Sequence, residues 1–393
     1  MKVLFWMFIG FDKHETSEHL LTAVIEQICK AGHEVHVLQK NTGGDLPPIP
    51  EKLKGLKVST DTVPFVAVAK NNFVARYLAE LKYIRACRKN IAKDYDAVFI
   101  QSNTVAGFAV RAVRKKLPKA IVTFNVQDIF PYNAVYSGSI KKNSVVFKVM
   151  AWLQRYGYKR VDHIITISED MKDTLVADGT DANKIEVIYN WSYQDEPYDR
   201  ESLDMTVPNK LFSSDYFNVV YAGNVGVMQN VDILIEAAAL MKDKRDVWFH
   251  IIGNGQYKEK LQKRTEEMGI SNISFLPMQP PEAAPSIYAA ADVNVIPLVK
   301  DVYRTALPSK TATCLACGKP IIFAIGKDSK FGQRVAKEAG CVVVESDSAE
   351  ELVRAINQCK NANKEALHTS FFVKHMEKTK NSYSYSDVIL RGA

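Results

Sequence analysis

The stretch NVVYAGNVG, residues 218–226, decides the fold class of this chain. Its apolar half has the composition of a buried β-strand, and it ends at Gly223, where the chain can turn sharply. A helix pattern follows over residues 231–241, and a second apolar run, 247–252, again ends at a glycine, Gly253. Strands that alternate with helices in this way predict a parallel sheet with helices on both faces.

The same alternation runs through both halves of the chain. The further expected strands are residues 3–9, 34–38, 97–100, 120–124, 163–167, 273–276, 293–296, 320–323 and 341–344. Residues 191–216 interrupt the pattern, since they are polar, acidic and weakly periodic, and they are interpreted as a connection. The sequence therefore predicts an α/β protein with two doubly wound, Rossmann-like domains that face a central cleft. Ligands of such sheets bind beyond the carboxyl ends of the strands.

The composition agrees with an ordinary globular protein of two or three domains. The chain has 393 residues, of which 47% are hydrophobic and 24% charged, so collagen-like, disordered and coiled-coil classes are excluded. No run of 18 apolar residues predicts a transmembrane helix, and the first residues read as a buried strand rather than a signal peptide. Six scattered cysteines fit thiols in a reducing cytoplasm.

Charge is distributed unevenly along the chain. Residues 1–160 contain 25 Lys and Arg against 12 Asp and Glu, whereas the remainder contains 26 against 32. Many of the basic residues of the first 160 lie in expected helices, with aromatic residues interspersed among them. Basic helices that carry aromatic residues suit an anionic membrane surface or a phosphate-bearing acceptor. Solvated helix faces are the alternative interpretation. No nucleic-acid-binding motif is present.

Glycines follow several expected strands. Gly10, Gly223-Asn224-Val225-Gly226 and Gly253-Asn254-Gly255 stand at strand-to-helix turns, where backbone N–H groups can approach a phosphate. Tight turns are the alternative. None of these stretches matches GxGxxG, so a nicotinamide cofactor is disfavoured.

Pro308-Ser309-Lys310-Thr311 is the sharpest candidate site. Ser309 is expected to cap the helix that follows. Lys310 in the first turn is unfavourable for the helix dipole unless an anion lies there, so it is predicted to clamp a diphosphate. A solvated lysine is the alternative.

Several short motifs recur in a recognisable order. They are AGHEV (31–35), TISE (166–169), KIEVIYNW (184–191), YAG (221–223), LIEAA (234–238), IIGNG (251–255), FL (275–276), YAAADV (288–293) and ACGKP (316–320). Across nearly the whole chain this pattern resembles the family 4 glycosyltransferases of the GT-B fold. Asn190-Trp191, the glycine turn at 223–226 and the motif at 308–311 most resemble the fucosamine-transferase-like branch of surface-polysaccharide assembly.

The resemblance implies transfer of a sugar from a nucleotide donor, UDP-linked in our expectation, with retention of anomeric configuration and without a metal or other cofactor. It implies an acceptor-binding domain over residues 1–200 and a donor domain over 201–368. Residues 369–393 would form a helix that crosses back to the first domain.

The chain departs from the family pattern on the donor side. The usual pair of glutamates falls on Thr305 and Thr313, and Thr313 would offer the donor ribose one hydroxyl. The usual arginine and lysine of the diphosphate site fall on Asn224 and Gln229, which leaves Lys310 as the main charge.

The remaining candidates lie on both sides of the expected site. Arg304 would assist Lys310, and the turn at Met278 would contact the donor base. The usual acceptor-side histidine falls on Asn125, for which Asp128 is the substitute base; a turn-forming aspartate is the alternative. His14 could approach the diphosphate, although a surface histidine is the alternative. Asp94-Tyr95-Asp96 is a formal DxD at the wrong end of the sheet for a metal.

The sequence as a whole predicts a cytoplasmic glycosyltransferase, peripheral on the inner face of the plasma membrane, that adds a sugar to a lipid-linked or polysaccharide acceptor. A non-catalytic GT-B subunit that supports a partner transferase is the first alternative. A nucleotide-sugar 2-epimerase is the second.

Overall fold

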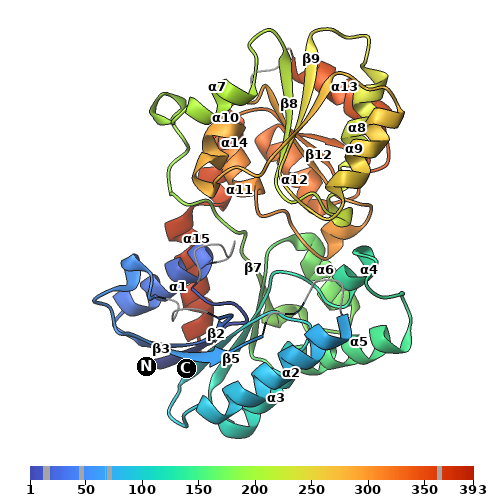
Figure 1. Ribbon diagram of the computed structural model, residues 1–393. Helices are drawn as coiled ribbons and strands as arrows, with labels where there is room; N and C mark the ends of the chain where they lie inside the picture. The colour runs from blue at the N-terminus through green and yellow to red at the C-terminus, as the bar shows by residue number, and fades with distance from the viewer. Residues whose placement is uncertain (12–17, 44–47, 67, 69–72, 361–364) are drawn as a thin grey trace. The chain divides into compact units, whose positions relative to one another are not determined.

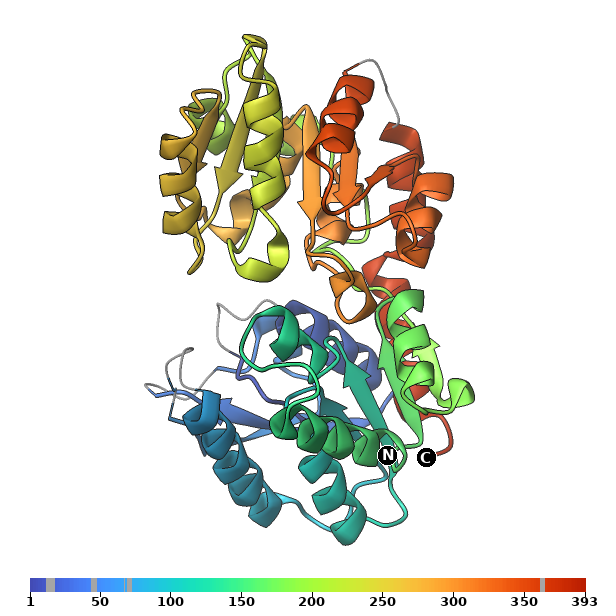
Figure 2. The same ribbon diagram turned by 90° about the vertical axis from the view of Figure 1, so that its right-hand side faces the viewer.

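The computed structural model describes residues 1–11, 18–43, 48–66, 68, 73–360 and 365–393. These residues form two compact units, which we call unit 1 (Met1–Asn190 with Lys378–Ala393) and unit 2 (Trp191–Glu377). Each unit contains one parallel sheet with helices on both faces (Figures 1 and 2). The predicted α/β class with two doubly wound, Rossmann-like domains is confirmed.

The sheet of unit 1 has seven parallel strands in the order β3-β2-β1-β4-β5-β6-β7. They are β1 (Lys2–Trp6), β2 (Glu34–Asn41), β3 (Val58–Pro64), β4 (Ala97–Gln101), β5 (Ile121–Val126), β6 (His163–Thr166) and β7 (Ile185–Val187). The central strands are apolar over nearly their whole length because helices cover both of their faces. Phe5 of β1 and Phe99 of β4 stack in this core with ring centroids 4.6 Å apart.

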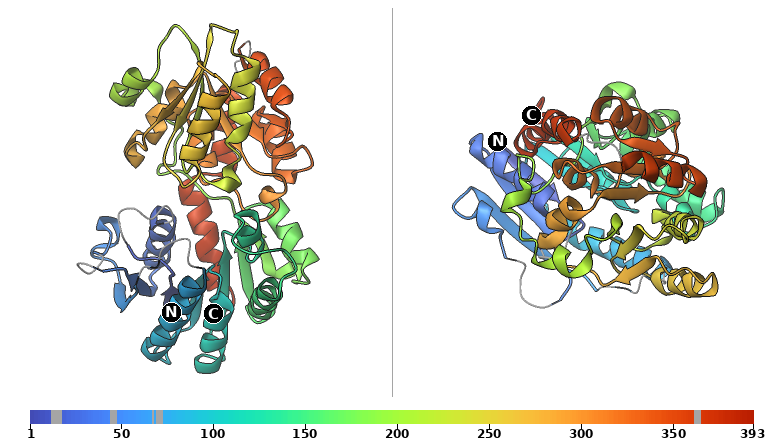
Figure 3. Two further views of the ribbon diagram at one scale, coloured as in Figure 1. Left: turned by 45° about the vertical axis from the view of Figure 1, so that its right-hand side comes forward. Right: turned by 90° about the horizontal axis from the view of Figure 1, so that it is seen from above.

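The helices of unit 1 come from both ends of the chain. They are α1 (Glu18–Lys30), α2 (Phe73–Asn90), α3 (Ala106–Lys116), α4 (Tyr132–Tyr136), α5 (Val145–Tyr158), α6 (Glu169–Ala177) and the C-terminal α15 (Lys378–Leu390). Figure 3 shows α15, drawn in red, beside α1 in dark blue, and α15 also packs on β4, β5 and β6. The last helix therefore completes the fold of the N-terminal unit.

The sheet of unit 2 has six parallel strands in the order β10-β9-β8-β11-β12-β13. They are β8 (Phe217–Ala222), β9 (Val247–Ile252), β10 (Ile273–Leu276), β11 (Val293–Pro297), β12 (Ile321–Ala324) and β13 (Val342–Val344). The helices are α7 (Thr206–Leu211), α8 (Asp232–Leu240), α9 (Lys258–Glu267), α10 (Ala284–Ala290), α11 (Thr311–Ala316), α12 (Lys330–Ala339), α13 (Ala349–Cys359) and α14 (Glu365–His375). The strand order reverses direction between β8 and β11, which is where doubly wound sheets bind ligands.

The division of the chain differs in detail from the expected boundaries at 200 and 368. Unit 2 already begins at Trp191, since Trp191 and Ser192 are buried and the Ser192 hydroxyl lies 3.1 Å from that of Thr313 in α11. Residues 369–393 form no single helix: α14 belongs to unit 2, and only α15 belongs to unit 1.

Two strands had no sequence signal. β3 carries polar residues at alternate exposed positions, and β7 has three residues, so neither has the apolar run on which the prediction rested. The six cysteines all lie in described parts of the chain, where they are buried thiols.

Candidate functional site

The predicted donor-side residues gather at the carboxyl edge of the unit 2 sheet. Gly223 follows β8, Gly253 follows β9, Met278 follows β10, and Lys310 follows β11 after a loop. Gly223 and Lys310 thus follow the two strands, β8 and β11, between which the strand order reverses. The sequence placed these four residues at the edge where parallel sheets bind ligands.

Close backbone packing explains two of the glycines. A Cβ atom on Gly253 would lie 1.8 Å from the carbonyl oxygen of Gly223, and one on Gly255 would lie 2.1 Å from that of Val225. The first turn also donates two hydrogen bonds to the second: Gly223 N–H donates to Ile252 O and Val225 N–H donates to Asn254 O, both at 2.9 Å. Those two amides are therefore already bonded.

The other two residues of the 223–226 turn are Asn224 and Gly226. Asn224 is exposed, and its side chain donates to Gln229 Oε1 at 3.2 Å. No acceptor within the described residues is recorded for the N–H groups of Asn224 and Gly226. These two amides are the ones that a phosphate could use.

The Lys310 ammonium lies beside this turn. Its Nζ is 3.8 Å from the centroid of the Tyr221 ring, a cation–π distance, and a Cβ on Gly223 would lie 2.7 Å from it. Gly223 has a φ of 143°, which disfavours any side chain. Glycine at this position therefore leaves the space that the ammonium occupies.

The ammonium is a buried cation without a matching acceptor. Lys310 is half-buried as a residue, but Nζ exposes less than 1 Å² and makes no hydrogen bond within the described parts of the chain. Burial lowers the pKa of Lys310 from 10.5 to about 8. An uncompensated buried charge is costly, and an anion bound here would supply the missing acceptor. The alternative of a solvated lysine is wrong.

Ser309 and Arg304 differ from what the sequence predicted for them. Ser309 is exposed and caps nothing, because the residue that precedes the first turn of α11 is Lys310 and no side-chain cap bond forms there. Arg304 is bound to Asp301 at 3.1 Å and to Asp328 at 2.8 Å, which already balance its charge. Assistance by Arg304 at a diphosphate would need those ion pairs to open.

Thr313 and Met278 have contrasting surroundings. The Thr313 hydroxyl lies 3.1 Å from that of Ser192, which lies 3.0 Å from Tyr198 Oη, so three hydroxyls form a buried chain. Met278 is 49% exposed after β10. Contacts of Thr313 with a ribose and of Met278 with a base stay predictions.

The carboxyl edge of the unit 1 sheet holds the acceptor-side candidates. Gly10 is buried after β1, and His14 lies outside the described residues. Asn125, at 2% exposure in β5, accepts from Gln127 Nε2 at 3.1 Å and from Tyr385 Oη at 3.4 Å. Asn125 is therefore enclosed in a polar network that α15 completes.

Asp128 lies beside the short helix α4, and its carboxyl group is perturbed by burial. Its Oδ1 accepts from Asn133 Nδ2 at 2.6 Å, which ties it to the short helix α4. Burial raises the pKa of its carboxyl from 3.8 to about 6, although the bond from Asn133 opposes the shift. A group that titrates near neutrality can accept and release a proton at physiological pH.

Two family profiles match this chain in succession. A profile of the "Glycosyl transferase 4-like domain" matches residues 18–191, and one of "Glycosyl transferases group 1" matches residues 216–361. The chain therefore consists of a glycosyltransferase 4-like domain followed by a glycosyltransferase group 1 domain. The boundary between the two profiles falls where unit 1 gives way to unit 2.

Curated relatives of this glycosyltransferase include two bacterial proteins. WcaI of Escherichia coli (strain K12), named for colanic acid biosynthesis, is 29% identical over 227 residues, which is 55% of this chain and 54% of WcaI. WbjE of Pseudomonas aeruginosa is 26% identical over 217 residues, which is 55% of this chain and 53% of WbjE. The chain therefore spans about half the length of the curated relatives it matches.

Solved structures show that the fold is GT-B. Anabaena Alr3699/HepE in complex with UDP matches with a TM-score of 0.71 at 14% identity, over 98% of this chain and 99% of that one. WaaG, a glycosyltransferase of lipopolysaccharide biosynthesis, matches with a TM-score of 0.70 at 15% identity, over 99% and 100%. At these identities the likeness concerns the fold alone.

Further structural findings concern metal binding and membrane insertion. Among the described residues, no group of three or more His, Cys, Asp and Glu side chains could hold a metal ion. Asp94 and Asp96 instead bind Lys2, through Nζ at 2.8 Å and the backbone N–H at 2.7 Å. No described helix is long and apolar enough to cross a bilayer.

Sequence reasoning missed three residues at these edges. Tyr221 was assigned to a strand and to the YAG motif but not to the site, although its ring contacts the Lys310 ammonium. Gln127 donates to Tyr385 Oη at 3.1 Å and accepts from Asn190 Nδ2 at 2.7 Å. No periodicity signals a contact between residues so far apart in the chain; the polar pair Gln127-Asp128 directly after β5 was the available hint.

Proposed function

We propose that the chain is a retaining glycosyltransferase that moves a sugar from a UDP-linked donor to a lipid-linked or polysaccharide acceptor in surface-glycan biosynthesis. No metal ion takes part in this proposal. Unit 2 binds the donor, and unit 1 supplies the acceptor-side residues. The proposed place of action is the cytoplasm, at the inner face of the plasma membrane.

The observation that carries the proposal is the Lys310 ammonium. It is buried, it has no hydrogen-bond acceptor among the described residues, and it lies beside Gly223, in the turn that also holds the Asn224 and Gly226 amides. A diphosphate would satisfy all of these groups at once. Binding such an anion would also raise the pKa of Lys310 again, so the site would be fully charged when occupied.

The chemistry follows from this charge. The bond between the anomeric carbon and the diphosphate oxygen breaks, and the leaving diphosphate gains negative charge, which Lys310 stabilises. A new bond forms from the acceptor oxygen to the same carbon. The acceptor's proton passes to the leaving phosphate or to Asp128, whose pKa of about 6 suits it as a base near pH 7.

Names of the relatives support the substrate classes. WcaI is named for colanic acid biosynthesis, and WaaG is described as a glycosyltransferase of lipopolysaccharide biosynthesis. Structures of HepE contain UDP, UDP with glucose, and UDP-glucose. These statements concern those proteins, and we extend them to this chain as a proposal.

A binding panel followed by a transfer assay tests the proposal. Nucleoside diphosphates and nucleotide sugars are screened for a rise in melting temperature, since a ligand that binds only the folded state stabilises it. Uridine derivatives should give the largest shift. The Lys310→Ala variant should then lose at least about a hundredfold in donor hydrolysis or transfer, which is the scale of removing one charge-stabilising group.

A non-catalytic subunit is the second candidate, and specific contacts favour it. Arg304 is balanced by two aspartates, and the Thr313 hydroxyl is bonded to Ser192, so two expected donor contacts are committed elsewhere. A chain that binds no nucleotide sugar and transfers none would support this candidate. Product formation without any acceptor would instead support the 2-epimerase alternative.

A further inference from the structure

Helix α5 carries large apolar side chains on its exposed surface. Val145, Val146, Val149 and Trp152 are 78%, 47%, 52% and 59% exposed. Val145, Val149 and Trp152 recur at intervals of four and three residues, so they line one side of the helix. Tyr156 continues the line, and its ring centroid is 5.9 Å from that of Trp152.

The opposite side of α5 is already used for packing. Phe147, Met150 and Leu153 are buried, and α5 packs against α3, where a Cβ on Gly157 would lie 3.3 Å from the Cα of Gly107. α5 thus carries large apolar side chains on both sides, although Lys148 and Arg155 also lie on it, and large exposed apolar patches usually mark an interaction site. The exposed side therefore lacks the covering that its composition suits.

The segment that contains α5 carries basic residues and no acidic ones. Residues 137–160 contain no Asp or Glu. The basic residues of the segment are Lys141, Lys142, Lys148, Arg155, Lys159 and Arg160. None of the six has an ion-pair partner among the described residues. A surface of this kind is complementary to an anionic one, and its aromatic residues have the amphipathic character of an interfacial anchor.

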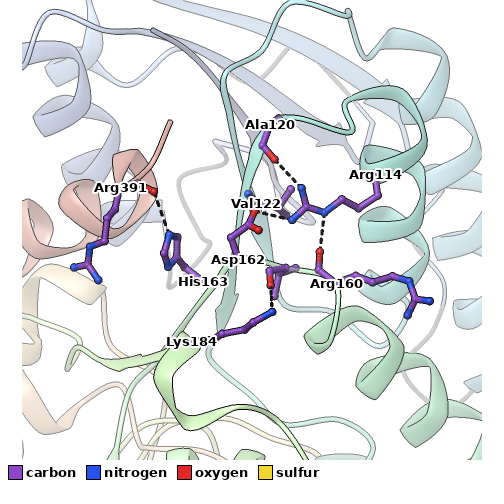
Figure 4. A network of polar contacts seen from close by, with 9 residues as sticks. Arg114, Ala120, Val122, Arg160, Asp162, His163, Lys184 and Arg391 are labelled. Atoms are coloured by element: carbon purple, nitrogen blue, oxygen red, sulfur yellow. Dashed lines mark hydrogen bonds and ion pairs between the residues drawn. The ribbon is translucent and has the colours of Figure 1, made fainter.

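The C-terminal end of α5 is held firmly, so the exposed side has a fixed orientation. Figure 4 shows the Arg160 carbonyl accepting from Arg114 Nε at 2.7 Å, while the Arg160 guanidinium points away from this network. Arg114 also binds Asp162 at 2.6 Å, just before β6. The Arg160 guanidinium instead stacks over Tyr156, 3.7 Å from its ring centroid.

We propose that the exposed side of α5 docks on an anionic lipid bilayer, with Trp152, Val149 and Val145 entering the headgroup region and the basic residues contacting lipid phosphates. A protein partner would need an acidic surface with an apolar centre, whereas a bilayer offers both by nature. This role of α5 rests on unit 1 alone. The reason for such docking, access to a lipid-linked acceptor in the bilayer, rests on the proposed function.

Trp152 provides a direct probe of the docking. The chain has four tryptophans, of which Trp6 and Trp191 are buried and Trp248 is half-buried, so Trp152 is the exposed reporter. The full chain is mixed with phosphatidylcholine vesicles containing phosphatidylglycerol, and with vesicles of phosphatidylcholine alone. We expect a blue shift of emission and quenching by brominated acyl chains with the anionic vesicles only.

Paired variants separate the apolar from the electrostatic contribution. Val149→Ser with Trp152→Ser should lower vesicle partitioning, read by sedimentation, about tenfold or more. Lys148→Gln with Lys159→Gln should lower it about thirtyfold, since two charges near the surface are removed. Leu240→Ser with Met268→Ser, two exposed apolar residues of unit 2, is the matched control and should change nothing.

Binding of UDP by the same variants distinguishes this proposal from the proposed function, because neither pair touches the donor-side residues. Vesicle binding without any nucleotide binding would leave the docking proposal standing and overturn the proposed function. Equal vesicle binding by all variants would overturn the docking proposal. So would the absence of vesicle binding together with α5-dependent self-association or binding to an acidic protein.

Discussion

At the carboxyl edge of the unit 1 sheet, buried amide side chains serve the turn after β1: Gln101 Oε1 accepts from Phe8 N–H at 2.9 Å, and Gln39 Oε1 from Phe11 N–H at 2.8 Å. At the corresponding edge of unit 2, glycines bring two backbone turns together and leave the Lys310 ammonium without an acceptor. The two sheets share a topology, but the groups at their carboxyl edges differ. Unit 1 supplies side-chain acceptors for the backbone N–H groups of its turn, whereas unit 2 retains a charge that suits an anion.

The largest expected effect concerns the glycine packing of unit 2. Gly253→Ala should lower the free energy of unfolding by about 4 kcal/mol, because the new Cβ would overlap the Gly223 carbonyl and φ is 149°. Gly269→Ala is the control: φ is 62°, but nothing lies within 4 Å, so about 1 kcal/mol is expected. Urea unfolding measures both, and equal losses would show that close approach does not explain Gly253.

The second prediction concerns the buried Lys310 ammonium, which has no hydrogen-bond acceptor among the described residues. Lys310→Met should raise the free energy of unfolding of the ligand-free chain at pH 7, by at most about 3 kcal/mol. Burial lowers the pKa of Lys310 from 10.5 to about 8, so the folded state bears this cost below pH 8 and loses it as pH rises toward 10.5. Exposed Lys300→Met should change stability by less than about 0.5 kcal/mol. A destabilised Lys310→Met chain would mean that the ammonium is satisfied in the folded protein.

Much of the contrast between the two sheet edges could be predicted from the sequence, and some of it could not. The alternation of apolar runs and helices predicted both sheets, and position after a strand brought Gly223, Gly253 and Lys310 to one edge. Their surroundings were not predictable, because the Tyr221 ring, the Ser192–Thr313 contact and the Asp301–Arg304–Asp328 ion pairs depend on packing. Tyr385 lies 260 residues from Asn125 and reaches it only through the placement of α15.

Substitution of Asp128 in unit 1 is expected to have a smaller effect on stability, one that depends on pH. Burial raises the pKa of Asp128 from 3.8 to about 6, so its ionised form destabilises the folded state above pH 6. Asp128→Asn should therefore stabilise the chain by about 2 kcal/mol at pH 8 and leave it unchanged near pH 3.5. Exposed Asp347→Asn serves as the control in the same thermal melts. A gain that is independent of pH would rule out titration of Asp128 as its source.

The smallest effect is expected at Arg304. Because two aspartates hold its guanidinium, Arg304→Gln should change UDP affinity less than about threefold and stability by less than about 1 kcal/mol. Calorimetric titration with UDP measures the first quantity. A loss of tenfold or more would show that Arg304 leaves its aspartates to bind the diphosphate, and the two edges would then differ by two cations rather than one.

The most direct test of the central claim is a titration of the chain with UDP between pH 7 and pH 9.5. If the Lys310 ammonium binds the diphosphate, affinity should be constant up to about pH 8 and then fall by about tenfold per pH unit, as the ligand-free lysine loses its proton. Lys310→Arg should bind UDP without this fall, since arginine stays charged. UDP affinity of the native chain that is unchanged from pH 7 to pH 9.5, or undiminished in Lys310→Met, would contradict the account.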